Sequence, residues 1–302
     1  MRTALLVVWH ALVRRLAPAA TVCAVLLVTA PASAQYVAMP DSTNNRLVYF
    51  DPFDGSVVNP NVFPLAAGTP IHAIQVGNEI WVSEQIGDRI SRWDLSGTPV
   101  GAITGALDNL RGMALANGIV YLCNDGTGNG APGASLHMFD PNGNNLGFFP
   151  TPSSSPFAIL DFQNSLLVAS DAANDDIHRY SYAGASLGTF HNSTGLNFAE
   201  QMDYATNGDI LVAGFSTNNI VRLNPADGSI ISSFAASGAR GVYQLGNGNI
   251  LWTNSGGAHV YDGTTSTQVY AGGGRFLQFI PEPTSLSLLG FGGALLLLRR
   301  RG

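Results

Sequence analysis

A pattern of about 42 residues recurs six times along the middle of the chain, and it constrains the fold more than any other feature. Each copy contains short apolar segments separated by turns, and the third segment of each copy ends in an aromatic residue or Leu. These ends lie at Phe50, Trp93, Phe139, Tyr180, Leu223 and Tyr261. A repeat of roughly 40–45 residues with four strands is typical of a propeller blade. The six copies therefore predict an all-β, six-bladed β-propeller.

Turn sequences separate the segments where antiparallel strands require them. Asn-Gly pairs stand between the first and second segments at residues 117–118, 207–208 and 247–248. We expect both residues of each pair to adopt positive φ, as in a tight β-hairpin. Between the third and fourth segments, turns are marked by Gly55, Gly97, Gly143, Gly184 and Gly228. Helical repeats of similar length are excluded, because the segments are too short and Gly, Asn and Pro interrupt them.

The two ends of the repeat region complement each other. Residues 275–280 have the pattern of a first strand, but no further strand pattern follows them. Residues 36–39 have the pattern of a second strand, and no first strand precedes them. We therefore expect the C-terminal strand to complete the first blade, which removes unpaired sheet edges. The predicted propeller domain spans residues 35–280, with four antiparallel strands per blade and both chain-terminal strands in one blade.

Residues 1–34 are typical of a secretory signal peptide. Basic residues near the start precede an apolar stretch, and the small residues Ala32, Ser33 and Ala34 match a signal peptidase site. Cleavage at that site would leave Gln35 as the first residue of the exported chain. An uncleaved membrane anchor is the alternative.

The last 22 residues, 281–302, contain three parts in a fixed order. Pro281, Glu282 and Pro283 are followed by an apolar run at residues 286–298 and by three arginines at residues 299–301. This order resembles the PEP-CTERM sorting signal of Gram-negative bacteria. The resemblance implies transient insertion in the inner membrane, processing by an exosortase, and release to the cell surface or exopolysaccharide matrix. A permanent transmembrane anchor is the alternative, although a membrane helix usually needs roughly 20 apolar residues.

The repeats are similar to NHL-type propeller units. Residues 110–114 and 239–242 match the start of such a unit, residues 168–171 approximate its middle, and residues 219–225 match its end. The resemblance covers about residues 36–280 and implies a propeller fold. It implies little about function, because propellers of this kind include lyases, lactonases and binding modules.

The distribution of charge excludes two classes of partner. All 14 basic residues are arginines, and the terminal segments contain six of them, whereas all 20 acidic residues except Glu282 lie between those segments. Nucleic acid is not expected as a partner, because its binding requires clusters of basic residues. An anionic membrane surface is not expected either. The C-terminal segment is therefore the only predicted membrane contact, and that contact is transient.

One position of the six first strands collects charged residues. Alignment of the strands places at the channel mouth His72, Arg111, Phe157, Glu200, Arg240 and Arg275. The three arginines could bind carboxylate groups through paired hydrogen bonds, for example those of an acidic exopolysaccharide. The alternative is that the arginines pair with acidic residues of the same face, for which the candidates are Glu84, Asp125 and Asp171.

The same acidic residues indicate a possible calcium site. Glu84, Asp125 and Asp171 follow the second strands of successive blades, and calcium prefers several carboxylate oxygens. The loop at residues 125–130 resembles the start of a calcium-binding loop, but its twelfth position is Leu136 rather than Glu. A flexible, solvated loop is the alternative, and no other cofactor is predicted.

Catalytic arrangements are few. His72 is the only histidine expected near the channel, where Glu84 or Glu200 could orient it as a general base. A purely structural role for His72 is the alternative. Cys123 is flanked by apolar residues, which predicts a buried thiol rather than a nucleophile.

These observations favour an exported, non-enzymatic binding module of the cell surface or matrix. The first alternative is a lyase or lactonase-type enzyme that uses a divalent metal. The second is a structural matrix protein without a discrete ligand.

Overall fold

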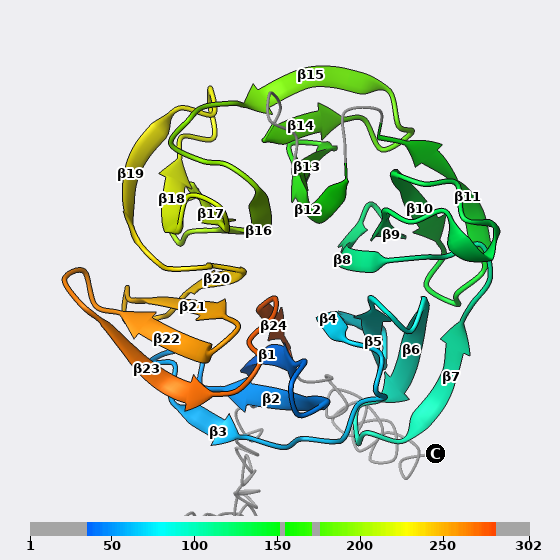
Figure 1. The fold of residues 1–302 in the computed structure, drawn as a ribbon, viewed down its shortest axis with the longest axis horizontal. Helices are drawn as coiled ribbons and strands as arrows, with labels where there is room; N and C mark the ends of the chain where they lie inside the picture. Colours follow the sequence, from blue (N-terminus) through cyan, green and yellow to red (C-terminus); the bar gives the residue numbers. More distant parts are fainter. Residues whose placement is uncertain (1–34, 152–154, 171–175, 282–302) are drawn as a thin grey trace, which may run out of the picture. The chain divides into compact units, whose positions relative to one another are not determined.

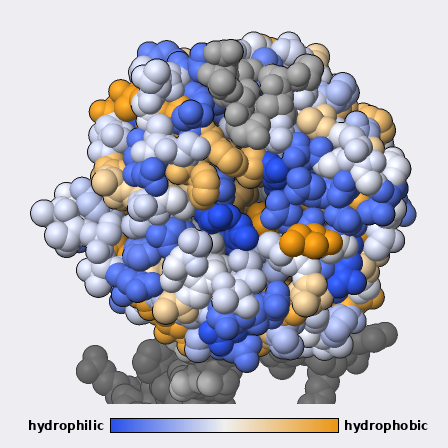
Figure 2. All heavy atoms as spheres, viewed as in Figure 1, coloured by the Kyte–Doolittle hydropathy of each residue, from blue (hydrophilic) through white to orange (hydrophobic). Residues whose placement is uncertain are grey.

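The computed structural model describes residues 35–151, 155–170 and 176–281. These residues form six antiparallel sheets of four strands each, arranged in a ring (Figure 1) around a central channel whose opening is visible as a hollow in Figure 2. The predicted six-bladed β-propeller is therefore confirmed. Helix is confined, in the described ranges, to the short 3-10 turn η1 (Gly128–Gly130).

Each blade runs from an inner strand beside the channel to an outer strand at the rim (Figure 1). The inner strands are β4 (Pro70–Val76), β8 (Leu110–Ala116), β12 (Pro156–Phe162), β16 (Ala199–Tyr204), β20 (Gly241–Gln244) and β24 (Gln278–Ile280). The second strands are β1 (Tyr36–Asp41), β5 (Glu79–Glu84), β9 (Ile119–Asn124), β13 (Ser165–Ser170), β17 (Ile210–Gly214) and β21 (Ile250–Asn254). The third strands are β2 (Arg46–Phe50), β6 (Arg89–Asp94), β10 (Ser135–Phe139), β14 (Ile177–Tyr180), β18 (Asn219–Leu223) and β22 (Gly257–Tyr261). The outer strands are β3 (Val57–Asn59), β7 (Pro99–Ile103), β11 (Asn145–Pro150), β15 (Ser186–His191), β19 (Ile230–Ala235) and β23 (Ser266–Ala271).

The blade that closes the ring contains strands from both ends of the described chain. Its order is β24-β1-β2-β3, and β24 pairs with β1 through Tyr36↔Ile280, Val37↔Phe279 and Ala38↔Gln278. The predicted closure is confirmed, but regular pairing covers only half of the expected 275–280 strand. Upstream of it a single bridge joins Asp41 to Gly274.

Buried hydrogen bonds around Asp41 strengthen this closure. Its carboxylate is fully buried and accepts hydrogen bonds from the Tyr270 hydroxyl at 2.5 Å and the Gly273 N–H at 2.9 Å. It also accepts bonds from its own turn, through Thr43 and Asn44. Burial alone would raise the pKa of Asp41, but these hydrogen bonds lower it to about 2.

The hydrophobic core is divided among the six interfaces between neighbouring blades. In the interface between the second and third blades, for example, Trp81 and Ile90 pack with Leu122 and Phe139. The second strands are buried almost throughout, as their continuous apolar sequences require, whereas the outer strand β7 is exposed along most of its length. Cys123 is fully buried in one of these interfaces, as predicted, and burial raises the pKa of its thiol.

The Asn-Gly turns differ from one another. Asn117 and Gly118 both have positive φ, at 49° and 75°, as expected for a two-residue hairpin. In the other two pairs only the glycines do, with Gly208 at 90° and Gly248 at 91°. The expectation for Asn207 and Asn247 was wrong, because these hairpins use a longer turn in which glycine alone takes the left-handed position.

The predicted segments at the two ends of the chain, 1–34 and 282–302, lie outside the described residues. Within 35–151, 155–170 and 176–281, no helix has the length and apolar character needed to cross a membrane.

Candidate functional sites at the two ends of the channel

The pairing of the inner strands defines one equivalent position in every blade. Pro70, Leu110, Pro156 and Ala199 each pair with the last residue of the second strand of their blade. Gly274 bridges Asp41 in the same way. In each blade, the inner-strand residue just after this pair occupies the equivalent position. In the blade of β20, the Gly241↔Thr253 pair shows that this position is Arg240. The column consists of Ile71, Arg111, Phe157, Glu200, Arg240 and Arg275.

His72 does not belong to this column, and its predicted position there is corrected. Ile71 occupies the equivalent place, and His72 lies one residue further along, level with Gly112 and Gln201. The register slips by one residue close to the column in β4, β8, β12 and β16. Such a β-bulge redirects a side chain and interrupts the alternation of the strand. Alternation of apolar residues therefore could not reveal the one-residue offset.

Three arginines of the column act on the buried carboxylate of a fourth column residue, Glu200. Glu200 is 4% exposed, and its Oε1 lies 3.9 Å from Arg240 Nη1. Burial raises the pKa of Glu200 to about 7, although the charges of Arg240, Arg275 and Arg111 each lower it. Burial and the charge of Arg240 lower the pKa of Arg275 to about 10. We call Arg111, Glu200, Arg240 and Arg275 the arginine mouth.

Arg111 is held in place by an aromatic ring and a carboxylate. Its guanidinium carbon lies 3.6 Å from the centre of the Phe157 ring, a close cation–π contact. Its Nη2 donates to Asp125 Oδ2 at 2.9 Å. Arg111 therefore pairs with Asp125, as the alternative interpretation of the arginine column predicted.

Three phenylalanines lie beside the arginine mouth. The Phe157 and Phe198 rings are 4.4 Å apart, the Phe198 and Phe215 rings 5.2 Å apart, and Arg240 lies over Phe215 at 5.0 Å. Figure 2 shows a pale orange patch beside the central hollow, next to the blue surface that surrounds it. The sequence did not reveal Phe198 and Phe215, because aromatic residues that face a channel and those of a core have the same pattern.

The predicted metal ligands have separate partners. Glu84 is fully buried, and its Oε2 accepts a hydrogen bond from Arg89 at 2.7 Å. Asp125 accepts from Arg111 and Asn109, and Asp171 lies outside the described residues. In the part of the chain that the structure describes, no three His, Cys, Asp or Glu side chains are grouped as metal ligands.

The loop at residues 125–130 is tied to neighbouring acidic residues. Gly128 N–H donates to Asp108 at 2.6 Å, and the Asn129 side chain donates to Asp88 at 3.0 Å. Part of the loop forms η1. These bonds hold the loop in a defined conformation.

His72 lines a cavity near the other end of the channel. Its Nδ1 accepts a hydrogen bond from the Met113 N–H at 3.1 Å, and its ring lies edge-on to Phe276 at 5.4 Å. Burial lowers the pKa of His72 to about 4, so the ring is uncharged at neutral pH. Neither Glu84, which pairs with Arg89, nor Glu200, at the arginine mouth, forms a hydrogen bond with His72 in the described structure. The predicted base with an orienting acid is therefore not assembled here.

Comparison with known proteins identifies the fold alone. No family model and no curated protein sequence matches the chain. Among solved structures, a protein of unknown function from Bacteroides caccae is similar, with 16% identity, a TM-score of 0.63, and coverage of 83% of this chain and 100% of that one. The nidogen/laminin complex contains a chain with 10% identity, a TM-score of 0.67, and coverage of 82% and 100%. A catalytically inactive virginiamycin B lyase from Staphylococcus aureus, solved with quinupristin, has 14% identity, a TM-score of 0.57, and coverage of 84% and 94%.

Proposed function

We propose that this protein is an exported, non-catalytic binding module whose arginine mouth binds carboxylate groups of an acidic exopolysaccharide. One observation carries the proposal: the positive charges of Arg240, Arg275 and Arg111 each lower the pKa of the buried Glu200 carboxyl. A site that already accommodates one carboxylate among three guanidinium groups has the charge and donors for another. Within the described residues, the buried Arg240 Nε has no hydrogen-bond partner.

The aromatic residues beside the mouth suit the same ligand. Phe198 and Phe215 provide apolar surface next to the guanidinium of Arg240. A sugar ring presents apolar C–H faces together with polar groups, and binding sites combine such surfaces with a few oriented polar groups. An acidic polysaccharide therefore matches both the charge and the surface of the mouth.

Export is the second part of the proposal and depends on sequence alone. Signal peptidase would remove residues 1–34, and an exosortase of a Gram-negative host would process the segment at Pro281, Glu282 and Pro283. Intact-mass measurement of the protein recovered from the extracellular matrix tests both cuts. A recovered chain that still contains either end would contradict this part.

A direct binding experiment tests the arginine mouth. We expect the full-length protein to bind polygalacturonate and not its methyl ester, which has the same backbone without the charge. The triple variant R111Q/R240Q/R275Q should lose this binding, and added salt should weaken it in the wild type. R222Q is the matched control, because Arg222 pairs with Asp209 away from the column. Equal binding of the two polymers would overturn the proposal.

Glu200 supports a second candidate, a lyase. A buried carboxylate with a pKa near 7 beside cations is typical of a general base. It could remove the proton from the carbon next to a uronate carboxylate while the bond to the glycosidic oxygen breaks and a C=C bond forms, with the leaving oxygen taking a proton from water. A lyase would release unsaturated, ultraviolet-absorbing sugars, and E200Q would abolish that product. A binding module would release none, and E200Q would bind the polymer at least as tightly as the wild type does.

A further inference from the structure

The cavity that contains His72 lies toward the opposite end of the channel from the arginine mouth. Ile74, Leu160 and Tyr204, from the later halves of β4, β12 and β16, contribute to its wall together with Phe279 of β24. Arg111, Arg240 and Arg275 instead lie at or just before the starts of β8, β20 and β24. Its volume is about 520 Å³. Pockets for small ligands usually measure roughly 300–1,000 Å³. The cavity is therefore large enough for a small organic molecule.

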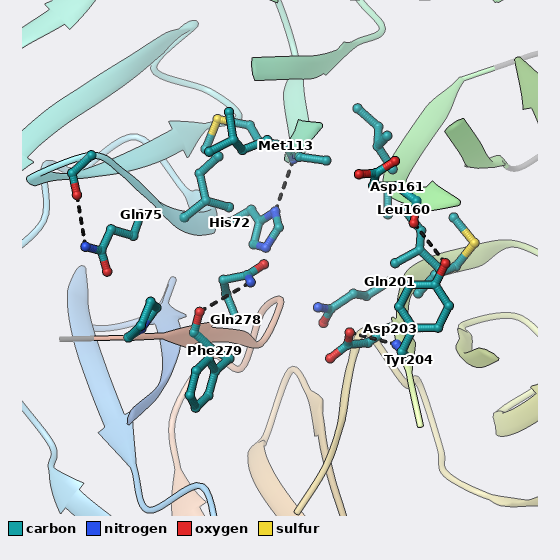
Figure 3. Close-up of a pocket in the computed structure, with 18 residues that line it drawn as sticks. His72, Gln75, Met113, Leu160, Asp161, Gln201, Asp203, Tyr204, Gln278 and Phe279 are labelled. Atoms are coloured by element: carbon teal, nitrogen blue, oxygen red, sulfur yellow. Dashed lines mark hydrogen bonds between the residues drawn. The ribbon is translucent and has the colours of Figure 1, made fainter. Parts of the chain in front are cut away.

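Two carboxylates from adjacent blades line this cavity. Asp161 comes from β12 and Asp203 from β16 (Figure 3). Asp161 Oδ1 accepts a hydrogen bond from the Tyr182 hydroxyl at 2.6 Å, and Asp203 Oδ1 accepts one from the Tyr204 N–H at 2.7 Å. The Tyr204 hydroxyl donates to the backbone oxygen of Asp161, which links the two strands. Among the described residues, no hydrogen-bond donor contacts the second oxygen of either carboxylate, which leaves that oxygen for a ligand.

No cation of the described chain balances these carboxylates. The wall of the cavity includes neither Arg nor Lys, and His72 is uncharged at neutral pH. Burial raises the pKa of Asp203 to about 7, and only the Tyr204 N–H opposes that effect. A positive group in the cavity would replace the lost solvation of the carboxylate.

The remaining wall suits an organic molecule. Tyr204 and Phe279 supply aromatic rings, and Gln75 and Gln278 supply side-chain amides. Gln201 also reaches the wall, but it is already bonded to Leu277 and Val242. Aromatic rings attract cations through their faces, and amides can hydrogen-bond to hydroxyl groups.

We propose that this cavity binds a small organic ammonium ligand. The ammonium group donates to Asp161 and Asp203, its carbon skeleton lies against Tyr204 and Phe279, and any hydroxyl groups meet Gln75 or Gln278. The chemistry fits an aminated sugar or a polyamine, since both offer an ammonium on a flexible carbon chain. This site is independent of the arginine mouth and of its proposed ligand.

Calorimetry with a matched pair of probes tests the charge. Glucamine and sorbitol share one polyol chain, and an ammonium replaces one hydroxyl in glucamine. We expect the full-length protein to bind glucamine about tenfold or more tightly than sorbitol, because hydrogen bonds to charged groups are the stronger ones. Putrescine, an ammonium without hydroxyl groups, separates the two sources. Tighter binding of glucamine favours an aminated sugar, and tighter binding of putrescine favours a polyamine.

Conservative variants locate the site. D161N and D203N should each weaken ammonium binding by about tenfold and leave sorbitol unaffected. D140N is the control, because Asp140 lies in an exposed turn and accepts bonds only from its own turn. If D203N failed to fold, the comparison of glucamine with sorbitol on the wild type would still decide. Equal binding of all probes, binding of none, or binding unchanged in both variants would each overturn the proposal.

Discussion

The substitution Asp41→Asn should weaken the closure of the ring by an amount that depends on pH. Asp41 has an ordinary pKa of 3.8 in the unfolded chain and a pKa of about 2 in the folded protein. This difference corresponds to about 2.4 kcal/mol of stability at pH 7. Because the folded pKa is the lower one, the contribution is complete above about pH 5 and declines as the pH falls towards 2. At pH 3 it amounts to about 1.3 kcal/mol.

Urea denaturation of the wild type and D41N at pH 7 and pH 3 measures this effect. We expect the difference in unfolding free energy to be about 2–3 kcal/mol at pH 7 and smaller by about 1 kcal/mol at pH 3. The matched control is D140N. Asp140 accepts hydrogen bonds from Asn142 and Asn144 much as Asp41 does from Thr43 and Asn44. The described bonds of Asp140, however, all come from its own turn and do not join the two ends of the chain.

Two results would refute this reasoning. An equal difference in unfolding free energy between the wild type and D41N at both pH values would show that the lost stability does not come from the charge of Asp41. An equal loss in D140N would show that the local turn, and not the bonds from Tyr270 and Gly273, accounts for the stabilisation.

Three further predictions concern buried groups. Gln201→Leu should lower the unfolding free energy by about 2–4 kcal/mol in urea, because it leaves two buried N–H groups of the inner strands without their acceptor. Binding of polygalacturonate should strengthen several-fold as the pH falls from about 8 to about 6, because Glu200 loses its negative charge near pH 7. The affinity of E200Q should not change over this range. In a C23S background, Cys123 should react with a thiol reagent only after unfolding, because its thiol is fully buried; rapid labelling of the folded protein would contradict the structure.

The sequence was sufficient to predict the architecture, because its signals are redundant. Each blade repeats the same order of apolar runs and turns, so an error in one turn, such as Asn207–Gly208, leaves the strand count unchanged. Closure was predictable because residues 36–39 and 275–280 each lacked a partner strand. Regular pairing in the closing strand is shorter than expected. Upstream of it, the carbonyl of Arg275 accepts a hydrogen bond from the Thr253 hydroxyl of the neighbouring blade.

The sites were less predictable, because they depend on offsets of a single residue. A β-bulge places Ile71 in the column where His72 was expected. The alternation of apolar and polar residues in the sequence does not indicate this bulge. Asp161 and Asp203 follow apolar residues near the ends of inner strands, where a sequence cannot distinguish a channel from solvent. Only the spatial arrangement shows that these carboxylates share a cavity.

The position of the closing strand limits how the protein can be trimmed. β24 ends at Ile280, and the next residue, Pro281, begins the predicted sorting segment. A protease that cuts after Pro281 would leave every hydrogen bond between β24 and β1 intact. A cut only four residues earlier would detach β24 and leave the first blade with three strands and an exposed edge. The predicted processing site and the first cut that would open the ring are therefore only four residues apart.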